Sequence, residues 1–169
     1  EFCSSHKELF EADVFIASDG PRLQPDQPTI FMGSRGVFNF AMTLNLRDGG
    51  HHSGNWGGLL ANPGVILSHA LATIVDAKGQ ILVDGWKAAP MTNAVRQALA
   101  KLNVGGGDGG PEIDPSWGEP GLTAEEKVFG SNTFEILAFE TGNPRNPVNA
   151  VPPRAVAHGH IRFVAGSDP

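Results

Sequence analysis

The chain has one cysteine among its 169 residues and is short of basic side chains. Cys3 cannot form a disulfide within the chain, which favours a reducing compartment such as the cytoplasm. Lys and Arg number 12 against 18 Asp and Glu, giving a net charge of −6. This balance, without any basic run interleaved with aromatics, argues against binding to nucleic acid or to an anionic membrane. No apolar run approaches the roughly 20 residues that span a bilayer, and the polar N-terminal segment is unlike a signal peptide.

What the chain does have is enough apolar material for a core. Hydrophobic residues make up 40% of the sequence, which excludes a wholly disordered chain. The length suits one domain, or one domain with part of a neighbour. The sequence begins at Glu1 without a methionine, so we expect it to be a piece of a longer protein.

Alternating apolar residues predict the strongest strand over residues 38–46. Phe38, Phe40, Met42, Leu44 and Leu46 alternate with smaller or polar residues, so one face is expected in the core. Further strands are predicted at 13–17, 29–32, 80–84, 134–139 and 155–164.

Helices are predicted between these strands. Asn62-Pro63 is a typical helix start, followed by an apolar stripe at helical spacing, with Gly79 as the expected stop. A second helix is predicted at 93–102, with Val95, Leu99 and Leu102 facing inward. Thr123 is expected to cap a third helix, after a glycine- and proline-rich loop at 103–121. Together the pattern predicts an α+β fold, an antiparallel sheet with helices packed on one face.

The segment from Arg47 to Gly58 places two histidines on a sharp bend. Five glycines in twelve residues let the backbone turn tightly, and His51, His52 and Ser53 lie on that turn. Loops of this kind often carry function because they can present an imidazole to a reacting group. By itself the segment fits a plain surface turn equally well.

Other candidate residues are ambiguous when taken singly. His158 and His160 share one strand face, which fits a metal pair, but the alternation favours a polar sheet face. Asp19 ends a predicted buried strand, either as a paired or metal-bound carboxylate or as a turn residue. Asn149 and Arg162 could recognise a carboxylate, or belong simply to a turn and the strand after it.

The order of these motifs resembles the di-zinc peptidase and aminoacylase family, which includes carnosinase-type dipeptidases, glutamate carboxypeptidase and succinyl-diaminopimelate desuccinylase. The matching motifs are Ser18-Asp19, Gly33-Ser34-Arg35-Gly36, Arg47-Asp48, His52-Ser53-Gly54, Gly57-Gly58, Asn62-Pro63, Asn149-Ala150-Val151-Pro152 and Ile161-Arg162. The resemblance implies a catalytic domain interrupted by a lid domain that also forms the dimer. Residues 1–33 would be the trailing segment of the catalytic domain, and 34–169 the lid/dimerisation domain, truncated at its C-terminal end.

The resemblance also implies roles for four residues. His52 would reach into the partner subunit's active site and stabilise the oxyanion of the tetrahedral intermediate. Asn149 and Arg162 would bind substrate, commonly its carboxylate. Asp19 would ligate one of two zinc ions in the intact enzyme. His51 has no counterpart that we can assign.

The family's remaining metal-binding motifs are missing from this chain. Its His-x-Asp pair, its paired glutamates and its C-terminal histidine are all absent from the sequence. We therefore expect the chain alone to hold no zinc and to be inactive. The sequence predicts the lid/dimerisation region of a homodimeric zinc metallopeptidase or amidohydrolase acting on a peptide or N-acyl amino acid. The alternative is a non-catalytic dimerisation module.

Overall fold

The computed structural model describes residues 2–14, 30–31, 33–105 and 110–168. The chain forms two compact units, Glu1–Met32 and Gly33–Pro169, and each is considered by itself. The first unit contains the short helix α1 (Phe2–Ser5) and the 3₁₀ helix η1 (Lys7–Phe10). Asp19 and most of the strands predicted at 13–17 and 29–32 lie outside the described residues, and the described parts of those segments form no strand.

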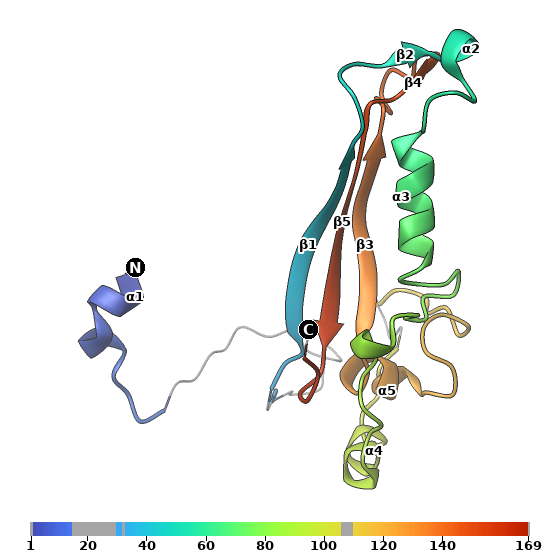
Figure 1. The fold of residues 1–169 in the computed structure, drawn as a ribbon. Helices are drawn as coiled ribbons and strands as arrows, with labels where there is room; N and C mark the ends of the chain where they lie inside the picture. The colour runs from blue at the N-terminus through green and yellow to red at the C-terminus, as the bar shows by residue number, and fades with distance from the viewer. Residues whose placement is uncertain (1, 15–29, 32, 106–109, 169) are drawn as a thin grey trace. The chain divides into compact units, whose positions relative to one another are not determined.

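The second unit is built on a three-stranded antiparallel sheet (Figure 1). Its strands are β1 (Gly36–Asn45), β3 (Thr133–Thr141) and β5 (Arg154–Phe163), in the order β1-β5-β3. β1 and β5 pair along their whole length, from Gly36 opposite Phe163 to Asn45 opposite Arg154. β3 pairs with the other edge of β5 and has a bulge between Ile136 and Ala138. The predicted antiparallel α+β fold is confirmed.

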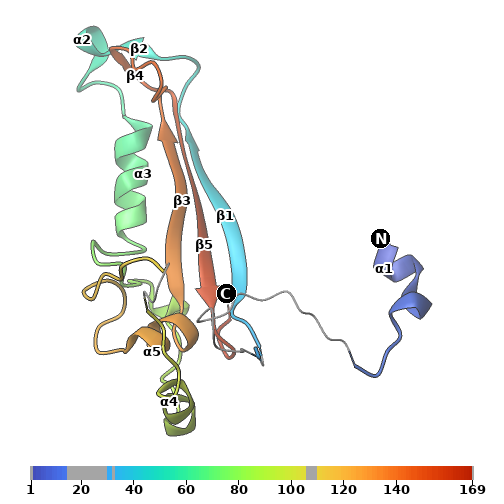
Figure 2. The same ribbon diagram turned by 180° about the vertical axis from the view of Figure 1, so that it is seen from behind.

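A second, two-stranded sheet lies beyond one end of the long sheet. It pairs β2 (His51–His52) with β4 (Ala150–Val151), and the four-residue helix α2 (Ser53–Trp56) follows β2 directly. Figure 1 shows these elements together at the upper end of the second unit, and Figure 2 shows the same arrangement from behind. We call residues 46–62 and 149–153 the tip.

Helix α3 (Pro63–Ala72) covers one face of the sheet and supplies the core. Leu67, Leu71 and Ile74 are buried from the helix side. They pack with Ile81, Phe134, Ala155, Ala157 and Ile161. The predicted apolar face of β1 is confirmed for Phe40, Met42 and Leu44, which pack against this cluster, whereas Phe38 and Leu46 are exposed.

The helix start was predicted correctly, but its end was not. Asn62 Oδ1 accepts hydrogen bonds from the backbone N–H groups of Gly64 (2.9 Å) and Val65 (3.3 Å), capping α3 as expected. The helix stops at Ala72, well before Gly79. Gly79 instead adopts φ +78° in a separate turn that the Asp76 carboxylate organises by accepting the backbone N–H of Gln80 at 2.9 Å.

Two further predictions between α3 and β3 need correction. The strand expected at 80–84 is wrong, because Ile81 makes one isolated bridge with Val75 and the chain then enters the 3₁₀ helix η2 (Asp84–Trp86). The second helix, α4, is shorter than predicted (Asn93–Leu99). Val95 and Leu102 are exposed rather than inward, since α4 packs on α5 and not on the sheet.

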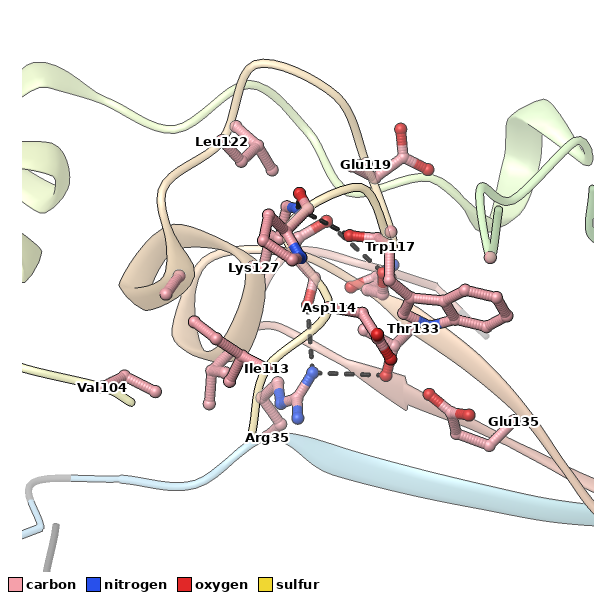
Figure 3. Close-up of a pocket in the computed structure, with 17 residues that line it drawn as sticks. Arg35, Val104, Ile113, Asp114, Trp117, Glu119, Leu122, Lys127, Thr133 and Glu135 are labelled. Atoms are coloured by element: carbon pink, nitrogen blue, oxygen red, sulfur yellow. Dashed lines mark hydrogen bonds between the residues drawn. The ribbon is translucent and has the colours of Figure 1, made fainter. Parts of the chain in front are cut away.

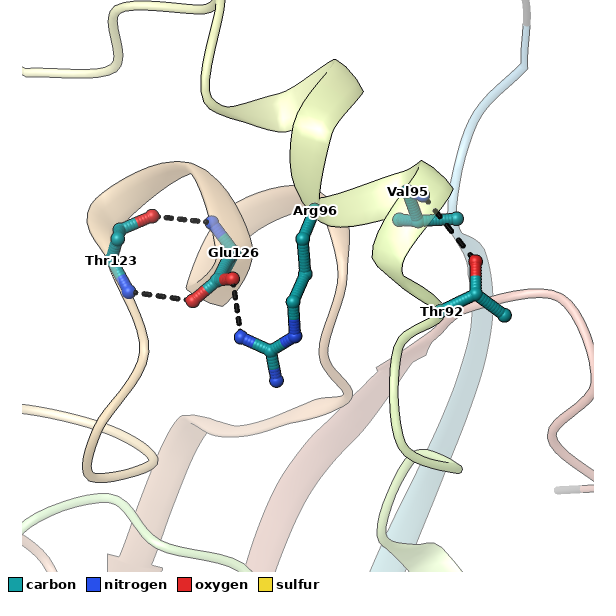
Figure 4. Close-up of polar contacts among 5 residues, drawn as sticks. All are labelled: Thr92, Val95, Arg96, Thr123 and Glu126. Atoms are coloured by element: carbon teal, nitrogen blue, oxygen red, sulfur yellow. Dashed lines mark hydrogen bonds and ion pairs between the residues drawn. The ribbon is translucent and has the colours of Figure 1, made fainter.

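Helix α5 (Ala124–Phe129) begins with the predicted Thr123 cap (Figure 4). Thr123 Oγ1 accepts the N–H of Glu126 at 3.3 Å, and the Glu126 carboxylate accepts the Thr123 N–H at 3.0 Å, completing a capping box. The same carboxylate accepts a 2.6 Å hydrogen bond from Arg96 Nη1 of α4. The described part of the 103–121 segment has neither helix nor strand, as predicted. Within the described ranges, no helix is both long enough and apolar enough to cross a membrane.

Candidate functional site

The tip brings His52 and Asn149 side by side. His52 of β2 pairs with Ala150 of β4, and the backbone N–H of Ser53 donates to the carbonyl oxygen of Asn149 at 2.9 Å. Both residues are exposed. Two motifs that are distant in the sequence are therefore adjacent at one end of the fold, as strand pairing allows.

The two histidines of the tip have different surroundings. The His52 ring accepts a hydrogen bond at Nδ1 from the backbone N–H of Gly54, at 3.1 Å, and so caps α2. The His51 ring instead lies edge-on to Trp56, with ring centroids 6.2 Å apart. A hydrogen bond from a backbone amide therefore orients the His52 ring, whereas the His51 ring has an aromatic contact.

Arg47 holds the tip together. Its Nη1 donates to the carbonyl oxygen of Pro152 at 2.9 Å and its Nη2 to that of Ala61 at 2.6 Å. The guanidinium thus joins the segment before β5 to the segment before α3. Sequence reasoning gave Arg47 no role of its own, because neither carbonyl is close to it in sequence. The only local signal was an arginine placed just after a strong strand.

Arg162 lies at the opposite end of β5. It pairs with Val37 on β1 and Thr133 on β3. It lies eight positions after Arg154, at the tip end of the strand, and these eight steps correspond to about 26 Å of extended chain. Within one copy, Arg162 and Asn149 therefore cannot bind the same small substrate.

Around Arg162 the end of the sheet is charged and hollowed. Arg35 Nη1 donates to the Ser131 carbonyl oxygen and to Thr133 Oγ1, both at 3.4 Å (Figure 3). Burial lowers the pKa of Arg35, neighbouring Arg162 lowers it further, and Glu135 partly opposes these effects. Arg35, Thr133 and Glu135, but not Arg162, line a cavity of about 520 Å³ with an apolar wall that includes Ile113 and Leu122.

The sequence of this chain matches a known protein family. The family described as "Peptidase dimerisation domain" of the M20 peptidases matches residues 32–169, most of the chain. The chain belongs to the M20 peptidase dimerisation-domain family. The resemblance inferred from the sequence motifs is thereby confirmed.

Relatives of this M20 dimerisation domain include dipeptidases. The Beta-Ala-His dipeptidase of Rattus norvegicus is 37% identical over 94 residues, covering 54% of this chain and 19% of that protein. The Cysteinylglycine-S-conjugate dipeptidase of Corynebacterium striatum is 23% identical over 171 residues, covering 95% of this chain and 35% of that protein. The chain thus spans only about a fifth to a third of these two relatives.

Solved structures share the fold. An M20 family metallo-carboxypeptidase from Sulfolobus solfataricus superposes with a TM-score of 0.72 at 24% identity, covering 99% of this chain and 45% of that one. Human carnosine dipeptidase 1 superposes with a TM-score of 0.60 at 22% identity, covering 79% of this chain and 30% of that one.

The described residues of this M20 dimerisation domain do not form a metal site. Nowhere in those ranges do three His, Cys, Asp or Glu side chains come together as ligands. His158 is exposed and His160 half-buried on the sheet face opposite the buried Ala157 and Ile161. The alternation of buried and more exposed residues along β5 supports the polar-face interpretation of the two histidines.

Proposed function

We propose that this chain is the lid and dimerisation region of a metal-dependent peptidase or amidohydrolase, and that His52 completes the active site of a partner subunit. The observation that carries the proposal is the exposed tip, where strand pairing holds His52 beside Asn149. Family membership supplies the peptidase and dimer context. The dipeptidase names of the relatives support a peptide substrate, and an N-acyl amino acid would present the same amide chemistry.

The two ends of the sheet would serve different active sites. His52 would donate a hydrogen bond to the carbonyl oxygen of the scissile amide as negative charge develops there. Asn149, adjacent to it, would contribute a second polar contact to the same substrate. Arg162 would bind a substrate carboxylate with its planar guanidinium at the other end of the sheet. Because a dipeptide is far shorter than about 26 Å, one substrate would meet the tip of one copy and Arg162 of another.

The remaining parts of the enzyme would come from outside residues 34–169. We propose that residues 1–33 are the trailing segment of a catalytic domain, and that Asp19 is this chain's one ligand to a pair of zinc ions. A single carboxylate is too few ligands for zinc, which takes about four. The chain alone would accordingly be inactive, and the homodimer of the intact protein would be the active species.

The test is His52→Ala in the intact parent protein. Loss of one oxyanion donor lowers kcat by roughly 10²- to 10³-fold. His51→Ala is the matched control, since its ring contacts Trp56 and lies outside the proposed chemistry. An unchanged kcat for His52→Ala would instead support a non-catalytic dimerisation module.

Mixing two inactive variants tests whether His52 acts across the dimer. A heterodimer of His52→Ala with Asp19→Ala has one site built from an intact catalytic domain and an intact tip. Activity should therefore reappear when the two purified variants are mixed and allowed to exchange subunits. If His52 acted within its own chain, both sites of the heterodimer would remain defective and no activity would return.

A further inference from the structure

His52 and Gly54 meet through a hydrogen bond and a close steric contact. The Gly54 backbone N–H donates to His52 Nδ1 at 3.1 Å. A nitrogen that accepts a hydrogen bond carries no proton, so the neutral ring has its proton on Nε2. We infer that Gly54 is a positioning residue for His52: its N–H holds the ring at Nδ1 and so leaves the Nε2–H as the hydrogen-bond donor. The catalytic meaning of this inference rests on the proposed function.

The side chain of His52, rather than the backbone, requires glycine at position 54. Gly54 is not among the glycines with positive φ, so alanine would suit its helical backbone. A Cβ at this position would, however, lie 2.8 Å from Cε1 and 3.1 Å from Nδ1 of the His52 ring. An exposed ring can rotate away from such a contact without disturbing the fold. Gly54→Ala should therefore displace the imidazole and leave the tip intact.

Gly57 provides a useful contrast within the same motif. A Cβ there would lie 2.5 Å from the backbone carbonyl oxygen of Ser53. Backbone cannot rotate away as a side chain can, so alanine at 57 would distort α2 itself. Of the two glycines, Gly54 alone allows the position of the ring to be changed separately from the fold of the tip.

The hydrogen bond can be observed directly in this chain by NMR. In ¹⁵N-labelled protein, under conditions in which the His52 ring is neutral, we expect a through-hydrogen-bond coupling between the Gly54 amide nitrogen and His52 Nδ1. Gly54→Ala should abolish it. Ser53→Ala should keep it, because the Ser53 contacts in the tip are made by its backbone. Absence of the coupling in the unmodified chain would overturn the inference.

Kinetics of the intact parent test the positioning role. Small displacements of a catalytic group cost up to about 10²-fold in rate, so Gly54→Ala should lower kcat by roughly 10- to 10²-fold with little change in KM. Its Tm should change little, since the helix propensity gained with alanine offsets the loss of the His52 cap of α2. A kcat equal to that of Ser53→Ala would refute the role. If instead His52→Ala itself leaves kcat unchanged while the coupling is present, the proposed function fails and the hydrogen-bonded geometry stands.

Discussion

The guanidinium of Arg47 offers the most direct test of how the tip is held. Arg47→Met keeps most of the side-chain volume and removes both hydrogen bonds, to Pro152 and Ala61. A hydrogen bond to a charged group contributes roughly 1.5–3 kcal/mol. Arg47 is half-buried and water can reach the freed carbonyls, so the lower figure applies and the pair contributes about 3 kcal/mol.

That loss should appear first as local opening of the tip. The amides of Ser53 and Leu46 donate to Asn149 and Pro153 across the tip, at 2.9 Å each. If Arg47 stabilises these pairings, about 3 kcal/mol corresponds to roughly 10²-fold faster hydrogen exchange at both amides in Arg47→Met. Amides of the central β1–β5 ladder should exchange at unchanged rates. Arg47→Lys should recover about half of the free energy, because an ammonium lacks the planar fork.

Arg154→Met is the matched control. Arg154 is also an arginine close to the tip, but it is exposed, and within the described chain its guanidinium makes no hydrogen bond or ion pair. Its substitution should leave exchange at Ser53 unaltered. Equal exchange rates in Arg47→Met, Arg154→Met and the unmodified chain would refute the role of Arg47 as the clamp of the tip.

Two predictions concern the rest of the unit. Asn132 is 4% exposed; its Nδ2 donates to the Trp86 carbonyl oxygen and its Oδ1 accepts from the Val164 N–H. Asn132→Ala leaves both partners without their hydrogen bond, so it should lower the free energy of unfolding, measured in urea, by about 3 kcal/mol. An unchanged free energy of unfolding would contradict this prediction. A hydrogen bond from the Val104 N–H is the main cause that lowers the pKa of Glu125. Its stabilising effect is therefore present at neutral pH and lost as pH falls below about 4. Glu125→Gln should show a shallower fall in urea midpoint between pH 5 and 3, and parallel curves would refute the link.

The parts of the fold that the sequence predicted well depend on short-range physics. Asn62-Pro63 and Thr123 start helices because their caps satisfy amides only two or three residues away. β1 and β5 were recognisable because α3 covers one face of each strand while the other face is polar. Apolar and polar residues therefore alternate along both segments of the sequence.

The incorrect predictions fall on segments whose conformation or burial depends on tertiary contacts rather than on the local sequence. Ile81 is buried as a strand residue would be, yet it pairs only with Val75 across a tight turn. Val95 lies on the apolar stripe of α4, but that helix packs on α5 and leaves the side chain exposed. For the candidate site, the sequence indicated His52, Asn149 and Arg162, but it did not predict which of them lie close together in the fold. The separation of Arg162 from His52 follows from the length and register of β5, which no local motif encodes.

That register ties the two ends of the molecule to each other. β5 leads from the tip, where β4 pairs with His52, to Arg162, and it pairs with β1 over ten residues without a bulge. A slip of one residue against β1 would move Arg162 to the face covered by α3 and shift the tip by about 3.3 Å. Such a slip is unfavourable because it would expose three residues that are now buried under α3 and bury their polar neighbours instead. The three residues are Ala155, Ala157 and Ile161. The apolar core beneath α3 therefore sets the spacing between the groups that we propose for two separate active sites.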